Sequence, residues 1–431
     1  MKANKIGLLT ILLFCFITCA FWARAYTQDH EAPDKAKLAA IINSAATKKA
    51  IADTIDGIPN IIFDMDTLAY DPFRDHILVA TLDFEHIPSG IHGTASLAYE
   101  WIDSDFVRIY TSYFLWGTAV SGNISADTTW NSAGSPYYIT DNTTVEHGVT
   151  LTIEPGTVVK VRKFNNRAIE IEVLGILICQ GATFTSSCDF ENYDNSQVTW
   201  NDCDWTGINF YREGAGTVQD SVIEYAQYGV DVYSDGGVSL TGNTFWRCSF
   251  GAHLARWSIL PQHTVDSNDF IDCYEAVVCY QQSQATTVSN NTFTSASKWG
   301  AWAAIYCDDN SSPAVTSNII SGQFSYGIRC RNNSSPEISA NTVENNNHGI
   351  ITVSGSNPLV INNNIAGNIT YGLSNSDSMI ILVAENNWWG DATGPYHWSL
   401  NPGGLGDPVS DSVDFEPWLT SAVTMLFIFS P

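Results

Sequence analysis

Acidic and basic residues that could act on a sugar stand at matching positions of two similar segments. Asp308 and Asp309 occur in the first segment, and Arg329 and Arg331 occur in the second, which begins 23 residues further on. A Ca²⁺-dependent polysaccharide lyase needs several carboxylates on one face and an arginine or lysine as base. Asp308 and Arg331 hold the same place in successive segments, so an ordinary ion pair explains them as well. We favour the ion pair.

Other catalytic patterns are absent from the sequence. It has no H-E-x-x-H, no G-x-S-x-G, no phosphate-binding glycine loop and no paired C-x-x-C. A glycoside hydrolase would need clustered aspartates with a histidine, and only His348 follows Asp308 and Asp309 closely; His253 and His263 are isolated. Four methionines and no Met-His cluster offer few ligands to copper. We expect no cofactor, with Ca²⁺ left open.

Aromatic side chains recur just before a small residue and an apolar residue, as in Gly327-Ile328. These positions are Tyr228, Phe250, Tyr326, His348 and Tyr371, with Glu275 and Ala303 between them. Rings repeated along one edge can form a platform for sugar rings, because their faces offer apolar contact. They can equally shield a corner of the core, which we favour slightly. Any ligand would use Tyr326, His348 and Tyr371.

These positions recur because the chain repeats itself. Residues 305–313 (IYCDDNSSP) return as 328–336 (IRCRNNSSP), and a polar anchor recurs at steps of 22 to 27 residues. That period is too short for helical repeats, and the units hold short runs of alternating apolar residues. We predict a right-handed parallel β-helix of about ten coils over residues 119–395, since each coil can bury its inner face only by stacking. The anchors are Ser221, Asn243, Asn268, Asn291, Asn318, Asn341, Asn363 and Asn386.

The anchor asparagines predict a ladder inside the β-helix. Asparagine tolerates left-handed corner geometry, and an inward amide can bond the amide one coil above and below. Cysteines form two further columns, one of Cys248 and Cys273 and one of Cys279, Cys307 and Cys330. Alternation points these sulfurs at the core, where we expect small apolar fillers; disulfides stay open, because coil spacing suits them.

The two ends of the chain lack the sequence pattern of the repeats. Residues 1–25 are predicted to be a signal peptide, with cleavage as a lipoprotein at Cys19 as the competing interpretation. Residues 26–118 are predicted to form a separate module of unreadable role, with a helix over 33–56 followed by short strands. A capping segment over 396–420 and a tail over 421–431 complete the chain. No segment beyond the leader is long and apolar enough to span a membrane.

Charge limits the partners. The chain has 19 basic and 45 acidic residues, a formal net charge of -26. Nucleic acid and anionic membrane surfaces would be repelled by such a protein. The hydrophobic fraction of 45% indicates a packed core rather than disorder.

Three stretches are similar to a known group of proteins. Residues 148–160 (GVTLTIEPGTVVK), 205–210 (WTGINF) and 386–395 (NNWWGDATGP) resemble the entry and exit coils of exported bacterial proteins with right-handed β-helix repeats. This pectate-lyase-like superfamily includes polysaccharide lyases and hydrolases, periplasmic copper-site maturation proteins and surface proteins without known activity. The resemblance implies the fold more strongly than the activity.

The sequence therefore predicts an exported protein of the cell surface, periplasm or medium. We expect a non-catalytic β-helix that binds or adheres to a polysaccharide or cell-surface glycan. The alternative is a carbohydrate-active enzyme, either a polysaccharide lyase or a glycoside hydrolase, acting on the face of the β-helix.

Overall fold

The structure of the chain is a computed structural model. It describes residues 35–44, 47–48, 61–74, 77–86, 91–102, 105–115, 117–161, 169–186, 205–255, 262–282, 285–295 and 300–424. The predicted leader over 1–25 and most of the predicted tail lie outside these residues. The chain divides into two compact units, one of residues 1–85 and 93–114 and one of residues 86–92 and 115–431.

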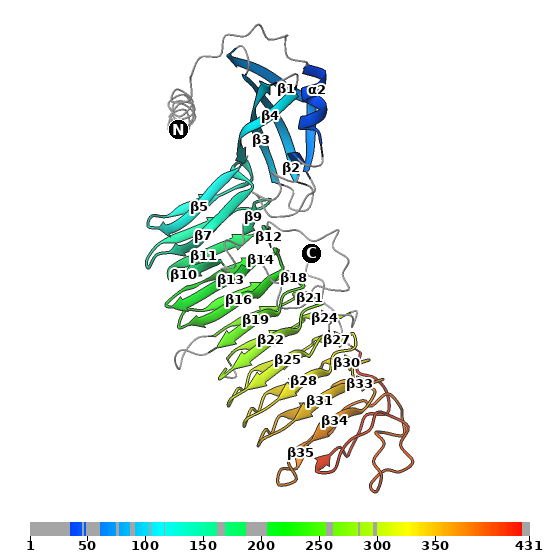
Figure 1. Cartoon of the computed structure of the whole chain (residues 1–431). Helices are drawn as coiled ribbons and strands as arrows, with labels where there is room; N and C mark the ends of the chain where they lie inside the picture. Colours follow the sequence, from blue (N-terminus) through cyan, green and yellow to red (C-terminus); the bar gives the residue numbers. More distant parts are fainter. Residues whose placement is uncertain are drawn as a thin grey trace. The chain divides into compact units, whose positions relative to one another are not determined.

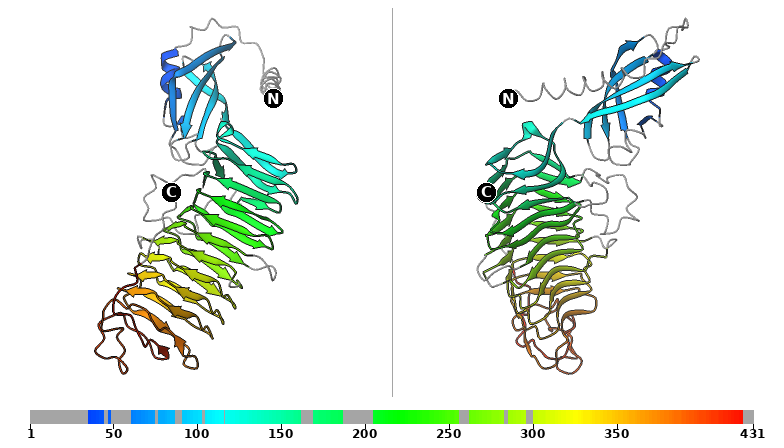
Figure 2. Two further views of the ribbon diagram at one scale, coloured as in Figure 1. Left: turned by 180° about the vertical axis from the view of Figure 1, so that it is seen from behind. Right: turned by 60° about the vertical axis from the view of Figure 1, so that its left-hand side comes forward.

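The described part of the N-terminal unit contains a four-stranded sheet with helix α2 beside it (Figures 1 and 2). Its strands neighbour one another in chain order: β1 (Ile61–Arg74), β2 (Ile77–His86), β3 (Ile91–Ile102) and β4 (Asp105–Leu115). Helix α2 (Lys35–Ile42) has Leu38 and Ile42 fully buried. These strands have 10 to 14 residues, longer than the short strands predicted.

The helix predicted over residues 33–56 is interrupted within its range. Helix α2 stops at Ile42, Asn43 and Ser44 form a turn, and Thr47 and Lys48 are helical again. There the Thr47 hydroxyl donates to the Ile41 carbonyl at 3.0 Å, and the Thr47 N–H donates to the Ser44 hydroxyl at 3.3 Å. Local bonds of this kind compete with the helical ladder, which the apolar spacing alone did not reveal. The rest of the predicted range lies largely outside the described residues.

The larger unit is a parallel β-helix, and the predicted right-handed solenoid is confirmed (Figure 1). Each coil contributes a first, a second and a third strand, and each strand pairs in parallel with its counterparts in neighbouring coils. The first strands are β6 (Thr128–Trp130), β8 (Thr150–Ile153), β11 (Ile176–Gln180), β14 (Ala215–Gln219), β17 (Val238–Thr241), β20 (Thr264–Asp266), β23 (Thr287–Ser289), β26 (Ala314–Thr316), β29 (Glu337–Ser339) and β32 (Leu359–Ile361). The second strands are β9 (Val158–Val161), β12 (Thr183–Ser186), β15 (Val222–Glu224), β18 (Thr244–Trp246), β21 (Asp269–Ile271), β24 (Thr292–Thr294), β27 (Ile319–Ser321), β30 (Thr342–Glu344) and β33 (Asn364–Ala366).

The third strands form the face on which the candidate site lies. They are β10 (Glu170–Val173), β13 (Trp205–Arg212), β16 (Ala226–Ser234), β19 (Phe250–Ala255), β22 (Glu275–Tyr280), β25 (Ala303–Asp308), β28 (Tyr326–Cys330), β31 (His348–Thr352) and β34 (Tyr371–Asn375). At the entry, β5 (Thr118–Ile124) and β7 (Tyr137–Val145) each run across both the second and third positions. At the exit, β35 (Leu382–Val383) pairs with β36 (Val413–Asp414).

Inward side chains form columns at coil spacing. The rings of Phe245, Phe270 and Phe293 stack with centroids 4.8 and 4.9 Å apart and planes 5° from parallel. The six cysteines that the structure describes are buried and are not joined by disulfides, in agreement with their predicted role as core fillers. Cys188 and Cys203 lie outside the described residues.

The anchor asparagines form a continuous hydrogen-bonded column. Each Nδ2 donates to Oδ1 of the next asparagine and to a backbone carbonyl of the preceding coil; for Asn341 these bonds measure 3.0 Å to Asn363 and 2.9 Å to Val315. The backbone N–H of Asn341 also donates to Oδ1 of Asn363 at 2.9 Å. Every polar atom of the amide is thereby satisfied inside the core. The column runs through Ser221, Asn243, Asn268, Asn291, Asn318, Asn341, Asn363 and Asn387.

Two details of the predicted ladder are wrong. Its last member is Asn387, which accepts from Asn363 at 2.8 and 3.0 Å, whereas Asn386 is exposed. The left-handed backbone also belongs to the residue before each anchor, such as Ala340 (φ 54°), Asn362 (φ 57°) and Asn386 (φ 56°). The anchor asparagine is therefore selected by its buried amide rather than by corner geometry.

We predict that Asn341→Leu lowers the free energy of unfolding by about 1–3 kcal/mol, because Asn318 loses its acceptor and Asn363 its donor inside the core. Chemical denaturation followed by circular dichroism measures the change. The matched control is Asn347→Leu, since Asn347 is exposed and should change stability by less than about 0.5 kcal/mol. Equal stability of the two variants would contradict the role given to the ladder.

The C-terminal segment closes the last coil with buried aromatic side chains. Trp389 is 0% exposed and Phe415 is 1% exposed, and both belong to the cluster that fills the β-helix. Trp398 lies in the same segment but is 68% exposed. Substitutions of the two tryptophans can therefore distinguish the effect of closing the core from the effect of covering the surface.

We expect Trp389→Ala to destabilise the protein by about 3–5 kcal/mol, because it opens a cavity at the end of a core that has no further coil to collapse onto. Trp398→Ala is the control and should leave the thermal midpoint nearly unchanged. Differential scanning calorimetry on both variants tests the assignment, and a larger loss in Trp398→Ala would reverse it.

Candidate functional site

The outer face of the third strands carries the predicted aromatic column. Backbone pairing places its members in register across successive coils: Tyr228, Phe250, Glu275, Ala303, Tyr326, His348 and Tyr371. The glycine that often follows is required by close packing. A Cβ at Gly327 would lie 2.6 Å from the backbone oxygen of Gly349, so only glycine fits there.

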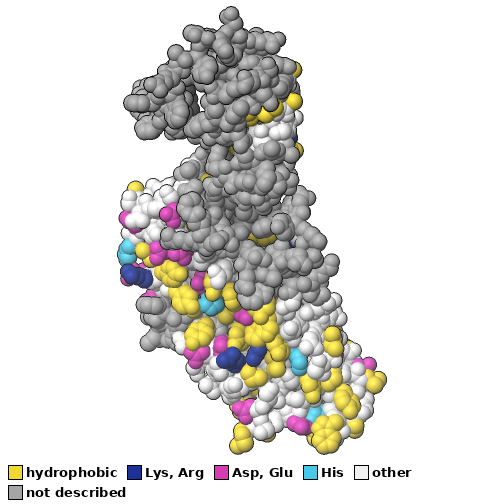
Figure 3. All heavy atoms as spheres, in the orientation of Figure 1, with side chains coloured by type: hydrophobic (Ala, Val, Ile, Leu, Met, Phe, Trp, Pro, Cys, Tyr) yellow, Lys and Arg dark blue, Asp and Glu magenta, His cyan; other side chains and the backbone are white. Residues whose placement is uncertain are grey.

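The rings of this column lie side by side and are only partly exposed. Tyr228 and Phe250 stack at 4.8 Å between centroids, whereas Tyr326 and His348 lie 5.6 Å apart and His348 and Tyr371 lie 6.0 Å apart. Figure 3 shows hydrophobic side chains gathered on this side of the β-helix, with charged groups among them. The register thus produces two groups of rings, separated at Glu275 and Ala303.

Trp302 and Tyr306, which the sequence interpretation did not single out, cover the break at Ala303. The indole of Trp302 meets the rings of Tyr306 and Tyr326 edge-on, with centroids 5.2 and 5.5 Å apart. Trp302 and Tyr326 pack against a small outer cluster that contains Val278. Trp302 was missed because it precedes the register position and no repeat unit shares it.

Arg329 lies at the centre of these rings. Its guanidinium carbon is 4.5 Å from the ring centroid of Trp302, 5.0 Å from Tyr326 and 5.7 Å from Tyr306. Its Nε is buried and has no hydrogen-bond partner among the residues that the structure describes. Three rings therefore hold the arginine by cation–π contact.

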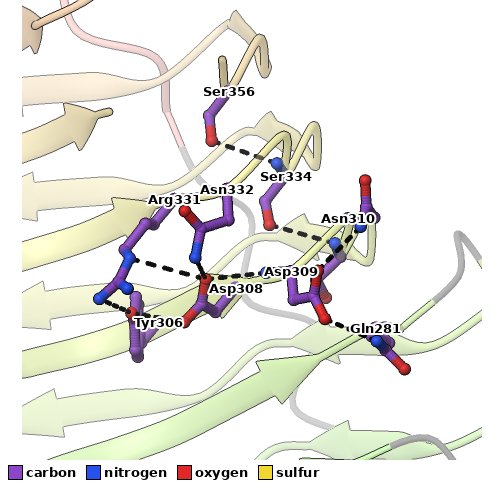
Figure 4. Close-up of polar contacts among 10 residues, drawn as sticks. Gln281, Tyr306, Asp308, Asp309, Asn310, Arg331, Asn332, Ser334 and Ser356 are labelled. Atoms are coloured by element: carbon purple, nitrogen blue, oxygen red, sulfur yellow. Dashed lines mark hydrogen bonds and ion pairs between the residues drawn. The ribbon is translucent and has the colours of Figure 1, made fainter. Parts of the chain in front are cut away.

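Asp308, the catalytic candidate beside Arg329, is engaged elsewhere (Figure 4). Its carboxylate accepts from the Tyr306 hydroxyl, the Asn332 amide and the Asp309 N–H, each at 2.8 Å. Arg331 Nε lies 4.0 Å away, which is the predicted pair between neighbouring coils. These contacts leave the carboxylate little freedom to exchange protons with a substrate.

Asp309 turns to a different set of partners in the same corner (Figure 4). It accepts from Gln281 Nε2 at 2.6 Å and from Asn310 Nδ2 at 2.9 Å. The hydrogen bond from Gln281 leads the contacts that lower the pKa of Asp309 below its ordinary value. The structure thus brings the four catalytic candidates to one corner. Asp308, Asp309 and Arg331 make structural contacts there, whereas Arg329 is enclosed by aromatic rings.

His253 is part of a pair rather than isolated. Its Nδ1 donates to Asp231 Oδ1 at 2.7 Å, and the ring lies among Tyr228, Tyr233 and Phe250. Both side chains are largely buried, at 14% exposure for His253 and 7% for Asp231. The 22-residue offset between Ser221 and Asn243 relates Asp231 to His253 as well, so the repeat could have revealed this pair.

Glu275 stands between the two groups of rings in an unusual environment. Burial raises the pKa of its carboxyl to about 7, with His253 and Arg329 pulling the pKa down and Asp308 pushing it up. Burial also lowers the pKa of His348, which keeps its imidazole neutral at neutral pH. The middle of the face thus carries a carboxyl that titrates near neutrality.

Three buried polar atoms on successive third strands lack partners in the described part of the chain. They are Arg329 Nε on β28, His348 Nδ1 on β31 and Ser374 Oγ on β34. Each unpaired buried group costs about 1–3 kcal/mol. Such groups therefore call for an explanation, and an absent ligand is one.

The side chains described do not assemble a metal site. Among residues 35–424, apart from the ranges that the structure leaves undescribed, no group of three or more His, Cys, Asp or Glu side chains could hold a metal ion. The thiols of Cys279, Cys307 and Cys330 form an inward column and are fully buried. A hydrogen bond with Cys307, together with burial, raises the pKa of Cys279 well above its ordinary value, which disfavours the thiolate that binds metals.

Comparison with models of known protein families gives a match. The family model for NosD, described as a periplasmic copper-binding protein, matches residues 120–300 and 186–398. No curated protein matches the chain at a significant level. No helix among the described residues is long and apolar enough to cross a membrane.

The match confirms the predicted β-helix resemblance and the predicted export to the periplasm or beyond. NosD is a family of right-handed β-helix repeats, and its model covers the solenoid from its entry to its exit. Because the matched residues span more than half of the sequence, the chain belongs to the NosD family of periplasmic proteins.

Proposed function

We propose that this chain is a non-catalytic periplasmic protein that binds a glycan on the outer face of its third strands. The observation that carries the proposal is the row of Tyr326, His348 and Tyr371, whose rings repeat at 5.6 and 6.0 Å. A row of rings at a regular interval suits a ligand that is itself a chain of rings. The apolar faces of sugars would pack on the aromatic rings.

The unpaired polar atoms beside this row support a hydroxyl-rich ligand. His348 Nδ1 and Ser374 Oγ are buried without partners in the described chain. Sugar hydroxyls both donate and accept, so they would satisfy a neutral imidazole nitrogen and a serine hydroxyl. An apolar ligand would leave both atoms without hydrogen-bond partners and would not remove the free-energy cost of burying them.

Catalysis is less well supported than binding. Asp308 is held by three hydrogen bonds and an ion pair, and Arg329 is held by three rings. A general acid or base must reach the reacting atoms with a proton to exchange. The carbohydrate-active enzyme that the sequence left open would have to use other groups.

Copper binding is the second candidate, because the matched family is described by that property. The described residues gather no group of three donors, so a copper site would need donors from outside them. Titration of the full chain with copper under anaerobic conditions decides this candidate independently of glycans.

We predict that the double variant Tyr326→Ala, Tyr371→Ala binds glycans about tenfold or more weakly, since buried aromatic anchors dominate such surfaces. Affinity electrophoresis against xylan, β-glucan, dextran, alginate and dextran sulfate measures binding, and thermal unfolding measures stability. The matched control is Tyr396→Ala, a tyrosine of the C-terminal segment that is 42% exposed.

Two outcomes contradict the proposal. One is a double variant that unfolds earlier but binds as tightly as the parent, which would make the rings a shield for the outer cluster. The other is a parent protein that binds none of the five polysaccharides.

A further inference from the structure

Arg329 lies on the face proposed to bind glycans and makes no close ion pair in the described chain. Within the described chain it makes no hydrogen bond or ion pair, and its contacts are the rings of Trp302, Tyr306 and Tyr326. Aromatic rings attract a guanidinium but cannot accept its N–H groups in the plane of the fork. The arginine is thus held in position while its hydrogen-bonding capacity stays unused.

The neighbouring carboxylates do not supply the missing acceptor. Asp308 accepts from Tyr306, Asn332 and the Asp309 N–H and pairs with Arg331. Glu275 lies on β22, two strands before β28 in the stack, and its burial favours the neutral form.

We propose that Arg329 binds an anionic group, a carboxylate or a sulfate, carried by the glycan. A planar guanidinium matches both groups with two parallel N–H···O bonds. This inference rests on the proposed glycan binding and deepens it, because it assigns the ligand to the class of acidic polysaccharides. The ring stack of Tyr326, His348 and Tyr371 would hold the sugar rings, and Arg329 would select their charge.

The acidic surface of the protein does not oppose this contact. Charges more than about 8 Å away are largely screened at physiological ionic strength. Charge-assisted bonds at the guanidinium act within contact distance and are stronger than neutral ones. The local arrangement of Arg329 and Glu275 therefore decides whether an anion binds.

Glu275 should make this binding depend on pH. The charged and titratable groups around it are Tyr228 on β16, His253 on β19, Tyr274 next to it in the chain, Asp308 on β25 and Arg329 on β28. Its pKa is raised to about 7, so the carboxyl is neutral below that pH and negative above it. Above pH 7 the carboxylate would compete with the ligand for Arg329 and repel it.

We therefore predict that affinity for alginate or dextran sulfate falls by roughly two- to fivefold from pH 6 to pH 8. Glu275→Gln should keep the affinity constant over this range, since it stays neutral. Isothermal titration calorimetry at constant ionic strength measures both. A wild-type affinity that is flat in pH, or a Glu275→Gln variant that keeps the slope, contradicts the role of Glu275.

Arg329→Gln should weaken binding of the acidic polysaccharides by about tenfold or more, because two charge-assisted hydrogen bonds are lost. Arg329→Lys should retain part of the affinity, since it keeps the charge without the fork. Alginate carries carboxylates and dextran sulfate carries sulfates, so the two arms identify the preferred group. Arg247→Gln is the matched control, because the Arg247 guanidinium lies 4.7 Å from the Trp246 ring but outside the third strands.

The outcomes separate this inference from the proposed function. If Arg329→Gln stays folded and binds acidic polysaccharides like the parent, the anion site is wrong. If Arg329→Gln and Arg247→Gln weaken binding equally, the effect is one of net charge and the site is also wrong. In either case, binding of neutral glycans by the parent protein would still support the aromatic platform. A parent protein that binds no glycan at all would contradict both the anion site and the proposed glycan binding.

Discussion

Parallel backbone pairing between coils is the constraint on which the rest of this structure depends. It makes direct neighbours of residues that lie one coil apart in the sequence, as the register pairs of Ala303 with Tyr326 and of Tyr326 with His348 illustrate. Inside the β-helix, the corners would contain buried polar atoms without hydrogen-bond partners if the asparagine amides did not bond to them. Because each amide forms hydrogen bonds to the coils on both sides, a substitution in one coil also destabilises the neighbouring coils.

The same register governs the outer face, where no core demands a particular residue. It brings Asp231 beside His253 and Tyr326 beside His348, and it sets the ring spacing near the coil repeat. The amides of the anchor column are satisfied by their own neighbours, whereas Arg329 Nε, His348 Nδ1 and Ser374 Oγ are not satisfied within the described chain.

Much of the fold was predictable because repetition is visible in the sequence. The repeat gave the anchors, the cysteine columns and the aromatic column, and the matched pair of Asp308 and Arg331. The errors arose where repetition stops. Two adjacent asparagines at residues 386 and 387 left the last anchor ambiguous, and the cage around Arg329 depends on Trp302, which no other coil repeats. Side-chain direction at a unique residue is set by packing, which periodicity does not encode.

The division between inward and outward columns also determines which properties of this chain can be inferred from its membership of the NosD family. A family model of a solenoid is dominated by the residues that every coil needs, which here are the anchors, the small residues before the apolar position and the core fillers. The outer residues can change without disturbing coil stacking, so relatives can share the fold and differ in ligand. The ligand that we propose for this chain therefore depends on Arg329, Glu275 and the rings around them, which are properties of this sequence and not of the repeat.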